Sequence, residues 1–186
     1  MKKNILLVII AVVACAMTSY AQGRKGLCIN EVMVQNDSSV IDDYGLRHGW
    51  IELYNSTHAP MEISSVYLTN DSTKPTLYPV PLGDVNTEIP ALQHVIFWAD
   101  GEPNKGTFHI SFQIKPGETI YIFDADQQTI LDKVTIPTDL KANTTFAYRI
   151  NSFWDCVRIV KAGYPKQSPN VRKEATLISR RKILWQ

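Results

Sequence analysis

The chain of 186 residues has few of the side chains that most enzymes and metal sites need. It contains three cysteines and four histidines, and none of these forms H-x-H, H-E-x-x-H or a Cys/His cluster. No G-x-S-x-G turn is present. We therefore expect no catalytic residues, no metal and no cofactor. The histidines, expected at the surface or satisfied in the core, are His48, His58, His94 and His109.

The acidic residues offer no calcium-binding loop. A calcium loop needs several oxygen ligands within a short segment, often with a glycine that fixes the turn. Asp124 and Asp126 lack the rest of that pattern, and they lie between two alternating runs. We predict that residues 124–128 form a hairpin turn.

Long apolar runs are also scarce, apart from one at the start of the chain. Lys2 and Lys3 precede an apolar stretch over residues 5–14, and Ser19-Tyr20-Ala21 supplies the small residues of a cleavage site. Residues 1–21 are therefore predicted to be a signal peptide, too short to span a bilayer comfortably. An alternative is a lipoprotein signal, in which Val12-Val13-Ala14 precedes a lipidated Cys15. Either signal exports the chain to the periplasm or the cell surface.

Net positive charge is confined to the two ends of the chain. The whole sequence carries +1, with two positive charges in residues 1–21 and a net four in residues 171–186, which leaves −5 on residues 22–170. An acidic body argues against nucleic acid as a ligand, because phosphate binding needs a positive surface. The basic tail, residues 171–186, either contacts anionic lipid or is simply solvated.

The body shows strand periodicity and no helical periodicity. Short runs rich in β-branched and aromatic residues are separated by Gly, Pro, Asn and Asp, which is typical of an all-β sandwich. Strands are predicted over residues 27–34, 50–54, 61–68, 76–80, 94–98, 108–114, 119–124, 130–136, 145–150 and 156–160.

Several of these segments, taken in order, resemble the lamin tail domain. The blocks are Ile29-Asn30-Glu31-Val32, Gly49-Trp50-Ile51-Glu52-Leu53-Tyr54-Asn55, Val66-Tyr67-Leu68-Thr69-Asn70-Asp71 and Phe146-Ala147-Tyr148-Arg149. The resemblance implies an all-β, immunoglobulin-like β-sandwich of the exported bacterial type over residues 22–170. It also implies a non-enzymatic interaction module, with a protein partner at the cell envelope.

A narrower resemblance implies a second function. Residues 43–53, with 94–100 and 106–109, are similar to bacterial lamin-tail proteins in which a membrane helix like the gamma subunit of sodium-pumping oxaloacetate decarboxylases follows the domain. The sequence shows no apolar run of membrane-spanning length after Asn170. The alternative function is an accessory subunit of such a complex.

One polar loop is the best candidate for a contact surface. It lies between two predicted strands and contains Asp43, Tyr44, Arg47 and His48. Most aromatic residues fall in strands and are expected in the core, whereas Trp154 is expected in an exposed loop. An exposed Trp154 is the basis for a third function, carbohydrate binding at the cell surface.

Two further predictions concern single residues. Cys28 and Cys156 either pair as a disulfide, as export permits, or are separate small core residues. Alternation places Glu52 opposite Ile51 and Leu53. We expect Glu52 to be solvent-exposed, the alternative being an ion pair with an arginine such as Arg149.

Overall fold

A computed structural model describes residues 24–147. The predicted signal peptide, Cys15, Trp154, Cys156 and the boundary at Asn170 lie outside these residues and stay predictions. Within residues 24–147 there are ten strands, and the only helices are two short 3-10 turns, η1 (Val85–Thr87) and η2 (Pro103–Lys105). In the same range, no helix is long and apolar enough to cross a membrane.

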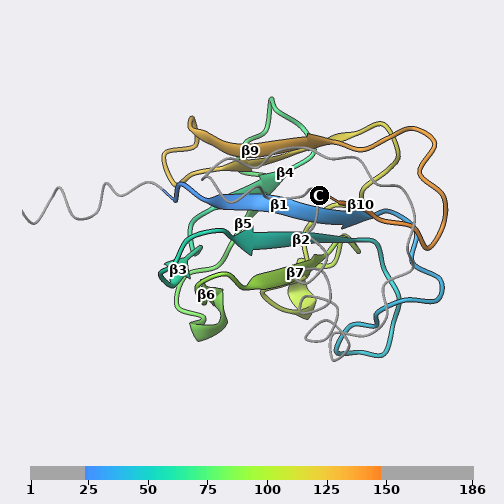
Figure 1. Cartoon of the computed structure of the whole chain (residues 1–186), viewed down its shortest axis with the longest axis horizontal. Coiled ribbons are helices and arrows are strands. Elements are labelled where there is room, and N and C mark those ends of the chain that lie inside the picture. The colour runs from blue at the N-terminus through green and yellow to red at the C-terminus, as the bar shows by residue number, and fades with distance from the viewer. Residues whose placement is uncertain (1–23, 148–186) are drawn as a thin grey trace, which may run out of the picture.

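The strands form two four-stranded antiparallel sheets and one small pair (Figure 1). The first sheet has the order β10-β1-β2-β7, with bounds Phe146–Ala147, Leu27–Met33, Trp50–Asn55 and His94–Trp98. The second has the order β5-β4-β8-β9, with bounds Tyr78–Pro79, Tyr67–Thr69, Thr119–Phe123 and Ile130–Thr135. The pair joins β3 (Met61–Glu62) to β6 (Glu88–Ile89).

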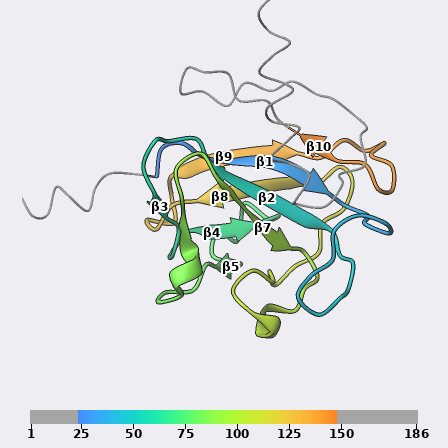
Figure 2. The ribbon, with the colours of Figure 1, turned by 60° about the horizontal axis from the view of Figure 1, so that its bottom comes forward.

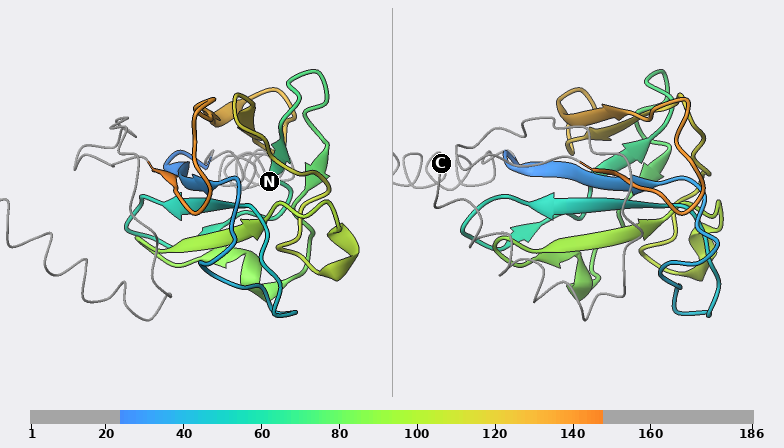
Figure 3. Two further views of the ribbon diagram at one scale, coloured as in Figure 1. Left: turned by 90° about the vertical axis from the view of Figure 1, so that its right-hand side faces the viewer. Right: turned by 45° about the vertical axis from the view of Figure 1, so that its right-hand side comes forward.

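The two large sheets share one core, so the predicted all-β, sandwich-like architecture is confirmed. Strand β9 lies beside β1 (Figure 2), and the two sheets are seen from two further sides in Figure 3. The backbone N–H of Ile29 donates a hydrogen bond to Asp132 Oδ2 at 2.9 Å. Alternation along β2 turns Ile51 and Leu53 into this core, where both are fully buried. The second sheet contributes Leu68, Ile120, Ile122 and Val134.

The opposite face of the first sheet is covered as well. Met33, Trp50 and Trp98 lie side by side across β1, β2 and β7 and form a second, smaller cluster. Glu52 points to this side and is fully buried, so the prediction of solvent exposure is wrong. The carboxylate accepts a hydrogen bond from Asn30 Nδ2 at 2.6 Å. Alternation gave the correct face, but sequence periodicity does not show whether that face meets water.

One predicted strand does not form. Residues 108–114 contain only an isolated bridge, in which His109 lies opposite Trp98. The segment nevertheless alternates, because Ile110, Phe112 and Ile114 are buried in the main core and Phe108 packs against it. The side-chain pattern of a strand is therefore present without its ladder of hydrogen bonds.

Strand β6 was not predicted, and the predicted segments also differ from the structure at turns. The predicted strand over residues 61–68 is divided into β3 and β4, and Ser65 between them has a left-handed φ of 64°. The predicted turn over residues 124–128 does join β8 to β9 as a hairpin. Asp126 fixes this turn by accepting hydrogen bonds from the backbone N–H of Gln128 and Thr129.

Candidate functional site

The connection between β1 and β2, residues 34–49, is tied by its own side chains. It extends from one end of the sandwich (Figure 1, lower right). Asn36 is buried, and its Nδ2 donates to the carbonyl oxygens of Val40 at 2.7 Å and His48 at 3.1 Å. Its Oδ1 accepts from the backbone N–H of Ser39. One amide side chain thus joins the two ends of the loop.

Asp42 organises the tip of this loop. Its Oδ1 accepts hydrogen bonds from the backbone N–H of Tyr44 at 2.9 Å and of Leu46 at 2.7 Å. Its own backbone N–H donates to the carbonyl of Leu46, and Gly45 takes the left-handed φ of 76° that the turn requires. The tip, residues 41–47, is therefore held in one conformation by hydrogen bonds.

This ordered tip exposes apolar side chains. Ile41 is 53% exposed, Tyr44 57% and Leu46 47%, although the loop could have carried polar residues at those positions. Asp43 and Arg47 are exposed beside them. We call residues 41–47 the contact tip.

A second loop, residues 99–118, lies against the contact tip and carries Asp100 and His109. This loop folds back against the end of β7. The backbone N–H of Trp98 donates to the Phe108 carbonyl at 2.7 Å, and that of Ile110 donates to the Trp98 carbonyl at 2.8 Å. This places His109 Nδ1 2.8 Å from Asp100 Oδ2, with both side chains buried. Lys105 Nζ lies 3.4 Å from the same Asp100 oxygen and 3.1 Å from Glu102 Oε2.

The surroundings of Asp100 and Lys105 in this loop favour the charged forms of both side chains. Burial alone would raise the pKa of Asp100, but hydrogen bonds from His109 and from the Glu102 backbone bring that pKa below its ordinary value. Hydrogen bonding to Glu102, and then to Asp100, raises the pKa of Lys105. Both groups are consequently ionised at neutral pH.

The two loops lie at the same end of the molecule (Figure 2), and Tyr44 joins them. Its hydroxyl donates to the Lys105 carbonyl at 2.7 Å, and its ring packs edge-on against the His109 ring with centroids 5.7 Å apart. Lys105 Nζ lies 5.8 Å from the centre of the same ring. These contacts hold the contact tip against the second loop.

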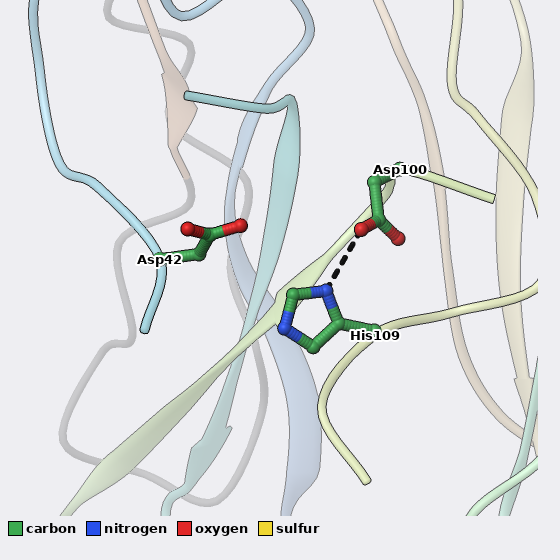
Figure 4. Close-up of side chains that lie close together, drawn as sticks. All are labelled: Asp42, Asp100 and His109. Carbon is green, nitrogen blue, oxygen red and sulfur yellow. Dashed lines mark hydrogen bonds and ion pairs between the residues drawn. The ribbon is translucent and has the colours of Figure 1, made fainter. Parts of the chain in front are cut away.

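Asp42 of the contact tip comes together with Asp100 and His109 of the second loop (Figure 4). Each offers one potential ligand atom, and these atoms lie within 4.8 Å of one another. His48 Nε2 is 3.4 Å from Asp42 Oδ2, without the alignment of a hydrogen bond. A polar pocket of about 240 Å³ opens beside His48, and Gln35, Asp37, Arg47 and Gln113 are among its lining residues.

The structure brings only part of the predicted contact set together. Asp43, Tyr44 and Arg47 are exposed on the tip, whereas His48 is half-buried and turned toward Asp42.

Cys28 is buried in β1, with Sγ 3.6 Å from the Tyr54 carbonyl; its predicted partner Cys156 lies outside the described residues.

Sequence reasoning missed the roles of Asp100 and His109. Asp42 is 58 positions before Asp100, and nine positions separate Asp100 from His109. No short motif covers those spacings. The only signal was that each residue sits where a predicted strand meets a polar loop.

Comparisons with known protein families, with curated protein sequences and with solved structures find no match.

Proposed function

We propose that this chain is an exported, non-enzymatic interaction module with an immunoglobulin-like sandwich of the lamin-tail type, and that the contact tip binds a protein partner at the cell envelope. The observation that carries this proposal is an internally hydrogen-bonded loop that exposes Ile41, Tyr44 and Leu46. A loop already held in shape loses little conformational entropy when it binds.

The chemistry of the tip supports a protein partner. Exposed aromatic and aliphatic side chains flanked by charges are the composition of an interface core with a polar rim. Here Tyr44 and Leu46 supply the apolar part, while Asp43 and Arg47 supply one charge of each sign. A surface of this kind fits a partner with an apolar groove bordered by polar groups.

A tagged pull-down from detergent-solubilised native membranes, with co-purifying proteins identified by mass spectrometry, tests this function. We expect stoichiometric recovery of an envelope protein by the wild-type chain and its loss with Leu46→Ser. Ile130→Ser is the matched control, because Ile130 lies on β9 and is 45% exposed, against 47% for Leu46.

The identity of the recovered proteins separates the possible functions. Biotin-dependent decarboxylase subunits would support the accessory-subunit function suggested by residues 43–53. Glycan-array binding that is lost with Trp154→Ala, without any protein partner, would overturn the proposal in favour of carbohydrate binding. Turnover of ester, glycoside or nucleic-acid substrates by the purified chain would contradict the non-enzymatic part.

A further inference from the structure

We propose that Asp42, Asp100 and His109 bind one divalent transition-metal ion, with Zn²⁺ as the representative, behind the contact tip. The three side chains come from two loops that are far apart in the sequence, and each residue is at most 6% exposed. Figure 4 shows the Asp42 carboxylate directed toward the space beside Asp100 and His109. This inference does not depend on the proposed function, because it concerns an ion and not a protein partner.

Asp42 has one carboxylate oxygen that the protein leaves unused. Its Oδ1 is held by two backbone N–H groups, whereas Oδ2 is buried and has no hydrogen-bond partner among the described residues. His48 Nε2, 3.4 Å away, is in the same condition. A buried carboxylate oxygen without a partner is costly, and a cation at this point would remove that cost.

The donor set selects the class of ion. Magnesium and calcium sites are built from oxygen ligands, whereas a set that contains an imidazole suits zinc and other first-row transition metals. Zinc bonds of about 2.0–2.2 Å in a tetrahedral site place the ligand atoms about 3.4 Å apart. The present spread of up to 4.8 Å therefore needs a closure of about one ångström or slightly more.

His109 is already oriented for such a role. Asp100 Oδ2 lies 2.8 Å from its Nδ1, so these two ligand atoms already face each other, and an ion between them would replace the proton that they share. The Tyr44 ring packs edge-on against the His109 ring and limits rotation of the imidazole from the other side. The geometry thus restricts the ring before any ion arrives.

The positive charge of Lys105 weakens cation binding at Asp100, so its removal should strengthen that binding. Its ammonium group is 3.4 Å from Asp100 Oδ2, so Lys105 and a bound cation compete for the same carboxylate. Lys105 retains Glu102 Oε2, 3.1 Å away, when Asp100 turns to the metal. Replacing Lys105 with Met removes the competing charge and keeps most of the aliphatic stem.

Calorimetric titration of ZnCl₂ into the full exported chain, tag-free and stripped with a chelator, tests the site. We expect one ion per chain, a loss of affinity of about tenfold or more in Asp42→Asn and in His109→Gln, and tighter binding in Lys105→Met. Asp43→Asn is the matched control, since it removes a neighbouring exposed carboxylate, and its affinity should equal that of the wild type.

Two results would overturn the site. One is the lack of saturable Zn²⁺ binding by the wild-type chain, and the other is equal affinity in Asp42→Asn and Asp43→Asn. If Asp42→Asn fails to fold by circular dichroism, Co²⁺ decides the question. A visible absorption band of four-coordinate Co²⁺ in the wild type that is lost in His109→Gln supports the site, and a spectrum unchanged by that substitution contradicts it.

Discussion

Tyr78 illustrates at the residue scale how burial changes the chemistry of one side chain. Its ring packs edge-on against Phe97, with centroids 6.3 Å apart, and its hydroxyl donates to the Thr107 carbonyl. Loss of solvent raises the pKa of Tyr78 to about 12. The folded state therefore holds this proton more tightly than the unfolded state does.

The pH dependence of stability follows from that difference. The contribution of Tyr78 is complete below pH 10 and is lost as the pH rises toward 12, a change of roughly 2–3 kcal/mol. Urea unfolding followed between pH 9 and 12 should show a steeper decline for the wild type than for Tyr78→Phe. Equal slopes for the two proteins would contradict the assignment.

Asn36 gives a second prediction at this scale. Asn36→Ala leaves the carbonyls of Val40 and His48 without their donor inside the loop, and we expect a loss of about 2 kcal/mol in the free energy of unfolding. Asp43→Ala, an exposed change in the same loop, should cost less than about 0.5 kcal/mol. Urea denaturation of the three proteins checks both values.

At the scale of the element, residues 108–114 act as a core segment without being a strand. Ile110 is fully buried among the side chains of both sheets. Ile110→Ala should therefore lower the free energy of unfolding by about 2–5 kcal/mol, whereas Lys115→Ala, at an exposed position nearby, should change it little. A similar, small effect for both substitutions would show that this segment is not part of the core.

The same segment shows how far the sequence predicts the elements. Alternation identified the core-facing side chains of residues 108–114 and of β2, because residues two apart share one face of a strand. It did not show that β1 and β2 are buried on both faces. It did not show which segments find a hydrogen-bonding neighbour, since pairing depends on contacts between distant parts of the chain. For the same reason Glu52 was assigned to the correct face and the wrong environment.

The candidate site was predicted only in part, for a related physical reason. The polar loop with Tyr44 was recognisable from its composition between two strands. Asp100 and His109 join it only through the fold, which brings the loop after β7 against the loop after β1. Separations of this length leave no motif in a single sequence.

At the scale of the whole molecule, the sandwich serves as a rigid support for two connected loops. The shared core fixes the ends of β1, β2 and β7, and the loops that leave those ends brace each other through Tyr44, Lys105 and His109. The contact tip is consequently presented at one end of the molecule in a defined shape (Figure 2). The proposed binding of a protein partner depends on that presentation.

The most direct test of this account is the affinity of the recovered partner for the wild type, Leu46→Ser and Ile130→Ser, measured by surface plasmon resonance. Truncation of an apolar anchor at an interface costs about 1–2 kcal/mol, so Leu46→Ser should bind about 5- to 30-fold more weakly. Ile130→Ser, equally exposed but on β9, should bind as the wild type does. Equal affinities for all three proteins would contradict the contact tip as the binding surface.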